Sequence, residues 1–231
     1  MNFAKKTVLG LLKFIGILVV SIIGAFIIVL GYSLLQVAIF ARGDYLFFLS
    51  KSISIIPVII IFFIFEYNYP KIKEKISNKK NEKEVKNQNA SKAKKTVILT
   101  ITAVFVGVLY IGITNYTILY KDTIKVASPI RPAGDTYNYS EINKIKVKVK
   151  KNLGGSYNLS YKVIFNNGDS AELFNGSMVE HKSGNHEDIL LSLDEQLKEQ
   201  GVEKEVNKKD FEKYAKELDK DFVSKIEKLF D

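Results

Sequence analysis

The stretch TVILTITAVFVGVLYIGITNYTILY, residues 96–120, contains no charged side chain and separates an apolar part of the chain from a polar part. At about 1.5 Å of rise per residue, a helix of this length extends roughly 35 Å. That is enough to cross a hydrocarbon core of about 30 Å with some tilt. The sequence therefore predicts a transmembrane helix at this position, and it is the third one along the chain.

Two earlier apolar stretches predict the other spans, at residues 8–41 and 45–67. The first is too long for the apolar core of a cleaved signal peptide, which has about 7–15 residues, and it lacks a clear small-x-small cleavage site. We therefore expect an uncleaved anchor. In the second span, Lys51 can extend to the nearby interface, and Pro57 should kink the helix.

The charge distribution predicts how these spans are oriented. The chain has a formal charge of +9, but the excess lies beside the predicted spans, and residues 120–231 are close to neutral. Lysines favour the cytoplasmic side, so we expect a multi-pass cell-membrane protein with a cytoplasmic N-terminus and an extracytoplasmic domain at residues 121–231. No basic face remains for phosphate contacts, so the sequence predicts no nucleic-acid partner.

Residues 71–95 form a basic segment with almost no apolar side chain. Such a segment cannot bury a core, and we expect a cytoplasmic loop. Its lysines either only set the orientation or also contact anionic lipids of the bilayer. The candidate lipid contacts are Lys71, Lys73, Lys75, Lys79, Lys80, Lys92, Lys94 and Lys95.

Small residues recur on one side of the first and third predicted helices. They are Gly24 and Gly31 on the first and Ala103 and Gly107 on the third. In lipid, such residues allow two backbones to approach closely, so these faces are expected to pack on each other. The alternative is that glycine is simply common in membrane helices.

Beyond residue 120 the pattern changes to that of an α+β domain. Residues 123–126 predict a strand, and SPIRPAG at 128–134 predicts a connection. Ile145, Val147 and Val149 alternate with lysines, which predicts a strand whose lysines face solvent. Residues 157–165 alternate in the same way, and NNGD at 166–169 is a turn before a short strand at 170–174. We expect an antiparallel meander of three or four strands.

Two helices are predicted after the strands. Asn185 can cap the first, an apolar stripe runs from Ile189 to Leu197, and Gly201 ends it. This helix is expected to cover one face of the sheet. The second is predicted over residues 208–230, where apolar side chains recur at spacings of three and four.

The segments YNYSEINKIKVKVKK from residue 137, YKVIFNNGD and ILLSLDEQLKEQG resemble bacterial PH-like domains that are attached to membrane spans. In that family a Tyr-x-Tyr-x-x-Ile segment leads into a strand, an aromatic strand ends in an Asp/Asn-Gly turn, and a helix closes the barrel. The resemblance covers about 70 residues. It implies a PH-like barrel or half-barrel, although only three or four of the seven strands are visible, and it implies no catalytic residue.

Few residues could carry chemistry. His181 and His186 are the only side chains suited to general base catalysis near neutral pH, and Glu180, Glu187 and Asp188 lie near them in the sequence. Their spacing matches no recognised metal site. The chain has no Cys, no phosphate-binding glycine loop and no Gly-x-Ser-x-Gly motif. The sequence therefore predicts no catalytic residue, no metal site and no cofactor.

These features favour a non-enzymatic integral membrane protein whose extracytoplasmic domain binds a protein or an envelope component. The alternative is an accessory subunit of a transporter or envelope assembly complex, and the small-residue faces would also suit a homo-oligomer. The partner itself has no signature in the sequence.

Overall fold

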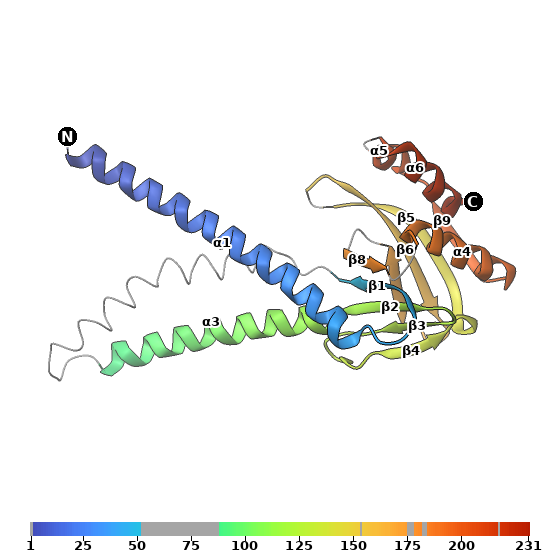
Figure 1. The fold of residues 1–231 in the computed structure, drawn as a ribbon, viewed down its shortest axis with the longest axis horizontal. Coiled ribbons are helices and arrows are strands. Elements are labelled where there is room, and N and C mark those ends of the chain that lie inside the picture. The colour runs from blue at the N-terminus through green and yellow to red at the C-terminus, as the bar shows by residue number, and fades with distance from the viewer. Residues whose placement is uncertain (1, 52–87, 153, 175–177, 182–183, 217) are drawn as a thin grey trace. The chain divides into compact units, whose positions relative to one another are not determined.

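A computed structural model describes residues 2–51, 88–152, 154–174, 178–181, 184–216 and 218–231 (Figure 1). The chain divides into two compact units. We call Met1–Leu34 with Ile53–Gly112 the helical unit, and Leu35–Ser52 with Ile113–Asp231 the sheet unit. The sheet unit therefore includes residues on both sides of Ile53–Gly112, the second segment of the helical unit, in the sequence.

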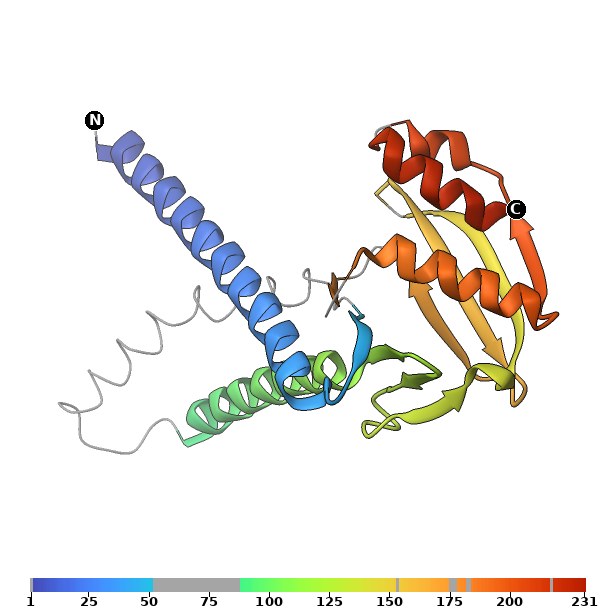
Figure 2. The same cartoon turned by 45° about the vertical axis from the view of Figure 1, so that its right-hand side comes forward.

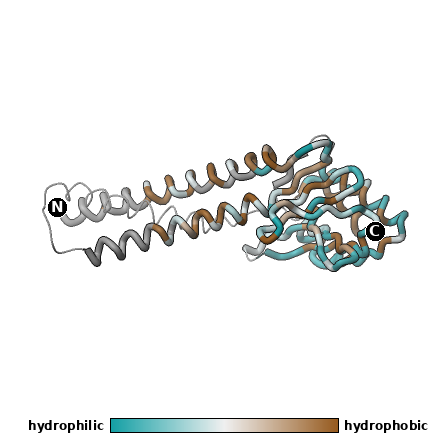
Figure 3. Tube along the Cα trace, turned by 90° about the horizontal axis from the view of Figure 1, so that it is seen from below, coloured by the Kyte–Doolittle hydropathy of each residue, from teal (hydrophilic) through white to brown (hydrophobic). Residues whose placement is uncertain are grey.

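The described part of the helical unit consists of long helices. They are α1 (Asn2–Phe40), whose last turns belong to the sheet unit, and α3 (Gln88–Thr114). Figure 3 shows hydrophobic residues along the described parts of both helices. Ser21, a polar residue in this apolar stretch of α1, donates a hydrogen bond of 2.8 Å from its hydroxyl to the Ile17 carbonyl, which satisfies it within the helix.

The predicted three transmembrane helices are wrong. Among the described residues, no helix combines the length and the apolarity that a membrane crossing requires. Two of the predicted spans also contain strands. Tyr45–Ser50 forms strand β1 and Tyr116–Tyr120 forms strand β2, and the two strands pair with each other. This finding also contradicts the multi-pass location in a cell membrane. The rest of the second span, from residue 52, lies outside the described residues.

Sheet A has five antiparallel strands in the order β4-β3-β2-β1-β8. The other three strands are β3 (Thr123–Val126), β4 (Asp135–Asn138) and β8 (Met178–His181). Phe47, Leu49 and Leu119 are fully buried in the main core. Phe48, Tyr116 and Ile118 lie in a second small cluster, to which Phe40 at the end of α1 contributes. Both faces of β1 and β2 are therefore buried.

Sheet B has the strand order β7-β6-β5-β9. Strands β5 (Ile142–Lys151), β6 (Tyr157–Phe165) and β7 (Ser170–Phe174) form the predicted antiparallel meander. Strand β9 (Glu203–Asn207) was not predicted, and it pairs parallel to β5. The Asn-Asn-Gly turn between β6 and β7 is confirmed, because the Gly168 amide donates to the Phe165 carbonyl at 2.9 Å.

Helix α4 (His186–Glu199) is confirmed, and Figure 2 shows it crossing sheet B. The second predicted helix is divided into α5 (Phe211–Ala215) and α6 (Lys220–Glu227), followed by a short 3-10 turn to Phe230. The division has a local cause, since the Asp219 side chain accepts hydrogen bonds from the amides of Asp221 and Phe222. That cap begins a new helix instead of continuing the old one.

One main core joins both sheets and the helices of the sheet unit. Leu190, Leu193 and Leu197 of α4 belong to the same core as buried apolar side chains of β5 and β6, such as Val147 and Val163. Side chains alternate along a strand, so the opposite face of β5 and β6 must carry the polar residues. The candidate site lies on this face of sheet B, which α4 does not cover.

Candidate functional site

A row of lysines lies on the face of sheet B opposite the core. We call Lys144, Lys146, Lys148 and Lys150 on β5, with Lys162 on β6, the lysine face. The alternating residues Ile145 and Val147 are 1% exposed, whereas Lys148 is exposed and the other lysines are partly exposed. This arrangement confirms the prediction that the lysines mark the solvent side.

Acidic residues of β9 neutralise one half of this face. The Lys144 ammonium lies 2.8 Å from the Glu203 carboxylate and 3.2 Å from Glu205, and Lys146 lies 2.8 Å from Glu205. The hydrogen bond with Glu203 contributes most to raising the pKa of Lys144. The parallel pairing of β9 with β5 places these side chains beside each other. Two lysines are thus matched by two glutamates.

The other half of the face surrounds one carboxylate, that of Glu172 on β7. Its Oε1 accepts hydrogen bonds from the Lys150 ammonium and, at 2.5 Å, from the Ser160 hydroxyl. Ser160 is 1% exposed. Burial raises the pKa of Glu172, but the hydrogen bonds from Lys150 and Ser160 outweigh this and bring it below its usual value. The positive charge of Lys162 also lowers that pKa.

Lys51 lies at the end of β1 and belongs to the same cluster. Its amide donates to the Asn115 carbonyl at 3.2 Å, which extends the pairing of β1 with β2 by one bond. Its half-buried ammonium interacts electrostatically with Glu172 and Lys162. Burial lowers the pKa of Lys51, Glu172 opposes this effect, and Lys162 adds to it. The sequence prediction that Lys51 extends to a membrane interface did not find this position.

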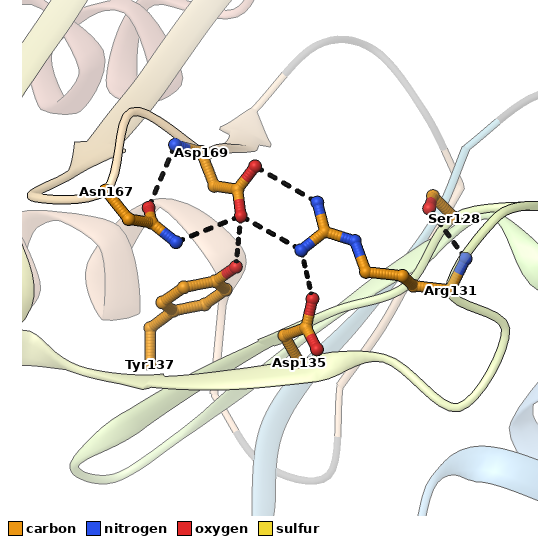
Figure 4. Close-up of polar contacts among 6 residues, drawn as sticks. All are labelled: Ser128, Arg131, Asp135, Tyr137, Asn167 and Asp169. Carbon is orange, nitrogen blue, oxygen red and sulfur yellow. Dashed lines mark hydrogen bonds and ion pairs between the residues drawn. The ribbon is translucent and has the colours of Figure 1, made fainter.

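A second polar cluster connects the β3–β4 turn with the β6–β7 turn (Figure 4). The Arg131 guanidinium donates two hydrogen bonds of 3.0 Å to the Asp169 carboxylate and also pairs with Asp135. The Tyr137 hydroxyl donates to Asp169 at 2.7 Å, and the Asn167 amide donates at 3.1 Å. Each of these side chains is bonded to another member of the cluster, which favours a structural role.

These contacts change the ionisation of Asp169. The hydrogen bond from Arg131 and then that from Tyr137 lower its pKa to about 2. Burial, followed by the hydrogen bond with Asp169, raises the pKa of Tyr137. A carboxylate with so low a pKa is a poor general base near neutral pH.

A third cluster fixes α4 on sheet B. The Tyr161 hydroxyl donates to the Asp194 carboxylate at 2.8 Å, and the Lys204 ammonium lies 2.6 Å from the other oxygen. The side chains of Lys204 and Asp194 are 13% and 7% exposed. Burial, followed by the charge of Asp194, raises the pKa of Tyr161 far above its ordinary value. The phenol therefore remains a neutral donor.

The two histidines occupy different surroundings. The buried ring of His186 lies between Phe47 and Phe174, at centroid distances of 4.4 and 4.9 Å, and its Nε2 is 2.9 Å from the Leu173 carbonyl oxygen. These contacts place His186 in the core and not in an open site. The backbone of His181 lies in β8, opposite Phe47. Within the described residues, no group of three or more acidic, His or Cys side chains could hold a metal ion.

The predicted small-residue face gains no contacts in the described structure. A Cβ added at Gly31 or Gly107 would meet no atom within 4 Å, and Ala103 is exposed. Gly24 is partly exposed. Packing between these residues therefore stays a prediction.

The predicted lipid contacts fall mostly outside the described residues. This applies to Lys71, Lys73, Lys75, Lys79 and Lys80, whereas Lys92, Lys94 and Lys95 lie in the first part of α3. Their contact with a bilayer stays a prediction.

One open pocket of the sheet unit lies beside the start of β5 and is lined by uncharged residues. Asn143, Asn166 and Gln200 supply amides, Ser140 supplies a hydroxyl, and Ile142, Gly201 and Val202 complete the lining. No lining side chain ionises near neutral pH. The pocket can donate and accept hydrogen bonds, but it offers no acid, base or nucleophile with a perturbed pKa.

No protein-family model, curated protein or solved structure matches this chain. The resemblance to PH-like domains therefore stays a prediction that rests on the quoted sequence segments alone.

Proposed function

We propose that this protein is a non-enzymatic interaction protein whose sheet unit binds an acidic protein or envelope component through the lysine face. The observation that carries this proposal is the alternation on β5, which puts four lysines on the side opposite the core. Two of them are matched by Glu203 and Glu205. The rest of the face keeps an excess of positive charge that can attract a partner.

The partner is expected to carry separated carboxylates or phosphates and not to be a nucleic-acid duplex. A duplex presents phosphates continuously, so a protein that binds it needs a basic surface without acidic interruptions. Here Glu172, Glu203 and Glu205 stand among the lysines. Alternating charges instead favour discrete ion pairs that set the register of a partner and the rate of its association.

A second candidate function is that of an accessory subunit of a larger assembly. It is favoured by the large apolar side chains exposed on the helical unit, such as Ile23, Ile27, Leu34 and Leu99, which are between 54% and 70% exposed. Large apolar side chains exposed in such number are typical of interaction surfaces. A photoreactive residue at position 27 should then cross-link to one stoichiometric protein or to a second copy of the chain.

The lysine face is tested by charge reversal in the full-length chain. Lys148→Glu and Lys162→Glu alter the half of the face that β9 does not neutralise. Each variant should bind polyglutamate or polyphosphate more weakly than the wild-type chain does. The difference in affinity should decrease as salt is raised, because exposed charges are screened within about 10 Å at 0.1 M salt. Fluorescence anisotropy of the labelled polymer measures the affinity.

Lys220→Glu is the matched control. Lys220 is exposed in the first turn of α6, where an acidic residue is tolerated, and it belongs to the helical layer of the sheet unit. Equal binding by the control and the face variants would refute the proposal. Tighter binding to duplex DNA than to either polymer, lost in the face variants, would instead assign the face to nucleic acid.

A further inference from the structure

The open pocket beside the start of β5 gathers four polar side chains. Its volume is about 440 Å³, within the range of roughly 300–1,000 Å³ that is typical of small-molecule sites. The segment that leads into β5, the β6–β7 turn and the end of α4 supply these side chains, which are Ser140, Asn143, Asn166 and Gln200. Within the described residues, none of the four side chains forms a hydrogen bond with another residue. Their donors and acceptors are therefore available to a ligand.

A β-bulge sets Asn143 apart from the regular pairing of sheet B. Its neighbours Ile142 and Lys144 pair with two consecutive residues of β6, so Asn143 is an extra residue without a partner on that strand. The pairing of β5 with β9 begins only at Lys144. Bulges are common beside functional sites, where they change the direction of a side chain.

The turn after α4 holds another part of the lining in place. Gly201 has a φ of +74°, and its amide donates to the Lys198 carbonyl at 3.0 Å. The Val202 amide donates to the Leu197 carbonyl at 3.1 Å. These two bonds form a Schellman motif, which fixes the main chain that carries Gln200.

The β6–β7 turn is held to the start of β5 by the Asn166 amide, which donates to the Glu141 carbonyl at 2.9 Å. The pocket is therefore pre-formed, and binding requires little ordering of the main chain. Because the amides of Asn166, Gly201 and Val202 are already bonded within the fold, recognition depends on side chains. Extended peptides are instead recognised largely through the main chain of a strand edge.

The pocket favours a ligand without charge. Its lining has no ionised side chain, and the charged residues next to it in the sequence are engaged elsewhere. Lys144 pairs with Glu203 at 2.8 Å, and the Glu141 carboxylate accepts from the Asn138 amide at 2.7 Å. Carboxamides and a hydroxyl can each bond to hydroxyl groups, and Val202 adds apolar surface. A sugar ring presents both hydroxyl groups and apolar C–H groups.

We propose that this pocket binds one neutral sugar unit of an oligosaccharide. The carboxamides of Asn143, Asn166 and Gln200 and the hydroxyl of Ser140 bond the hydroxyl groups of the sugar. This inference goes beyond the proposed function, because it concerns another site and requires none of the lysines of the lysine face.

Binding is measured through a thiol placed in the lining. The chain contains no Cys, so Ser140→Cys introduces a single thiol, and mass spectrometry of the full-length chain follows its reaction with iodoacetamide. Tetramers of glucose, mannose and N-acetylglucosamine are the neutral probes, and at least one should protect the thiol. At ten times the dissociation constant of that probe, the reaction should be about tenfold slower. The thiol of Ser192→Cys, exposed on α4, should react at an unchanged rate.

Matched variants, each combined with Ser140→Cys, separate recognition from damage to the fold. Gln200→Ala removes a lining carboxamide and should weaken the protection, whereas Gln196→Ala removes an exposed carboxamide of α4 outside the lining and should not. Gln200→Lys should lose protection by the neutral sugar and gain protection by a tetramer of galacturonic acid. A damaged fold does not gain a ligand, and Gln196→Lys controls for the added charge.

The proposal is overturned if no neutral tetramer slows the reaction of the thiol introduced by Ser140→Cys. It is also overturned if a capped tetraalanine peptide protects that thiol better than every sugar, since the pocket would then bind peptides. Equal protection in Gln200→Ala and Gln196→Ala would place the sugar outside the pocket, which likewise overturns it.

Discussion

Replacing Asp194 by alanine should be among the most destabilising single changes in the sheet unit. Its carboxylate accepts from Tyr161 at 2.8 Å and from Lys204 at 2.6 Å, and these contacts join β6, α4 and β9. Asp194→Ala leaves the Lys204 ammonium, whose side chain is 13% exposed, without its counter-charge. Breaking a buried ion pair from one side costs about 3–5 kcal/mol of the free energy of unfolding. With a urea dependence of about 2 kcal/mol per molar, the midpoint should fall by roughly 1.5–2.5 M.

The assay can use the absence of cysteine in this chain. Ala171 is fully buried, so a single cysteine at that position reacts with a thiol reagent only when the sheet unit opens. Thiol labelling against urea concentration then reports the stability of the full-length chain. The reference is Ala171→Cys alone, with Asp194→Ala added in the test variant.

Two controls separate the buried pair from a general effect of charge removal. Asp188 pairs with Lys225 at 2.7 Å, but its side chain is 51% exposed, so Asp188→Ala should cost at most about 1 kcal/mol. Adding Lys204→Met to Asp194→Ala removes the stranded charge and should recover part of the loss. If Asp194→Ala costs no more than Asp188→Ala, the cluster does not stabilise the fold as argued.

Two further predictions concern the β6–β7 turn. Because Arg131 lowers the pKa of Asp169 to about 2, the ionised form stabilises the folded state above the usual pKa of 3.8. That stabilisation should be lost as the pH falls from 3.8 to 2, so the urea midpoint should fall over this pH range. In Arg131→Met the urea midpoint should depend less on pH over the same range. Gly168 has a φ of +86°, so Gly168→Ala should cost about 1–2 kcal/mol in the same urea assay. Gly154→Ala, at an ordinary φ with nothing within 4 Å of the added Cβ, is the matched control and should cost less.

The strands of the meander could be predicted because their alternation is unambiguous. In β5 every second residue from Lys144 to Lys150 is a lysine, and the residues between are apolar. Only an extended chain separates these two sets onto opposite faces. The turn residues between β6 and β7 gave an independent signal, because Gly168 adopts a positive φ.

Strands β1 and β2 could not be predicted because their sequences contain no alternation. YLFFLS and YTILY are continuous apolar runs, since both faces of these strands are buried. Such a run cannot be told from a helix by periodicity, and here each run adjoined a longer apolar stretch. Strand β9, EKEVN, could not be predicted for the opposite reason. It is largely exposed and polar, and its pairing depends on glutamates that meet the lysines of β5.

The candidate site could be predicted only in part. The alternation places the lysines of β5 on one face, but it does not reveal which of them are neutralised. Lys51 is distant in the sequence from Lys162 and Glu172, and it joins them only because β1 belongs to the sheet unit. The apolar residues around Lys51 in the sequence favoured a membrane span, and that interpretation gave no reason to place Lys51 near Glu172.

The topology of sheet B explains why anions should concentrate at one end of the lysine face. The order β7-β6-β5-β9 puts Glu203 and Glu205 on one edge strand, where they meet Lys144 and Lys146. Farther along β5, Lys148 and Lys150 lie opposite Ser160 and Asn158 of β6, and the Lys150 ammonium pairs with the Glu172 carboxylate. Strand β9 pairs with β5 only from Lys144 to Lys148, so its acids do not reach the remaining lysines. The same pairing that completes the sheet therefore leaves Lys148 and Lys150 beyond the reach of these two glutamates, whereas Lys162 lies on β6 opposite Lys146.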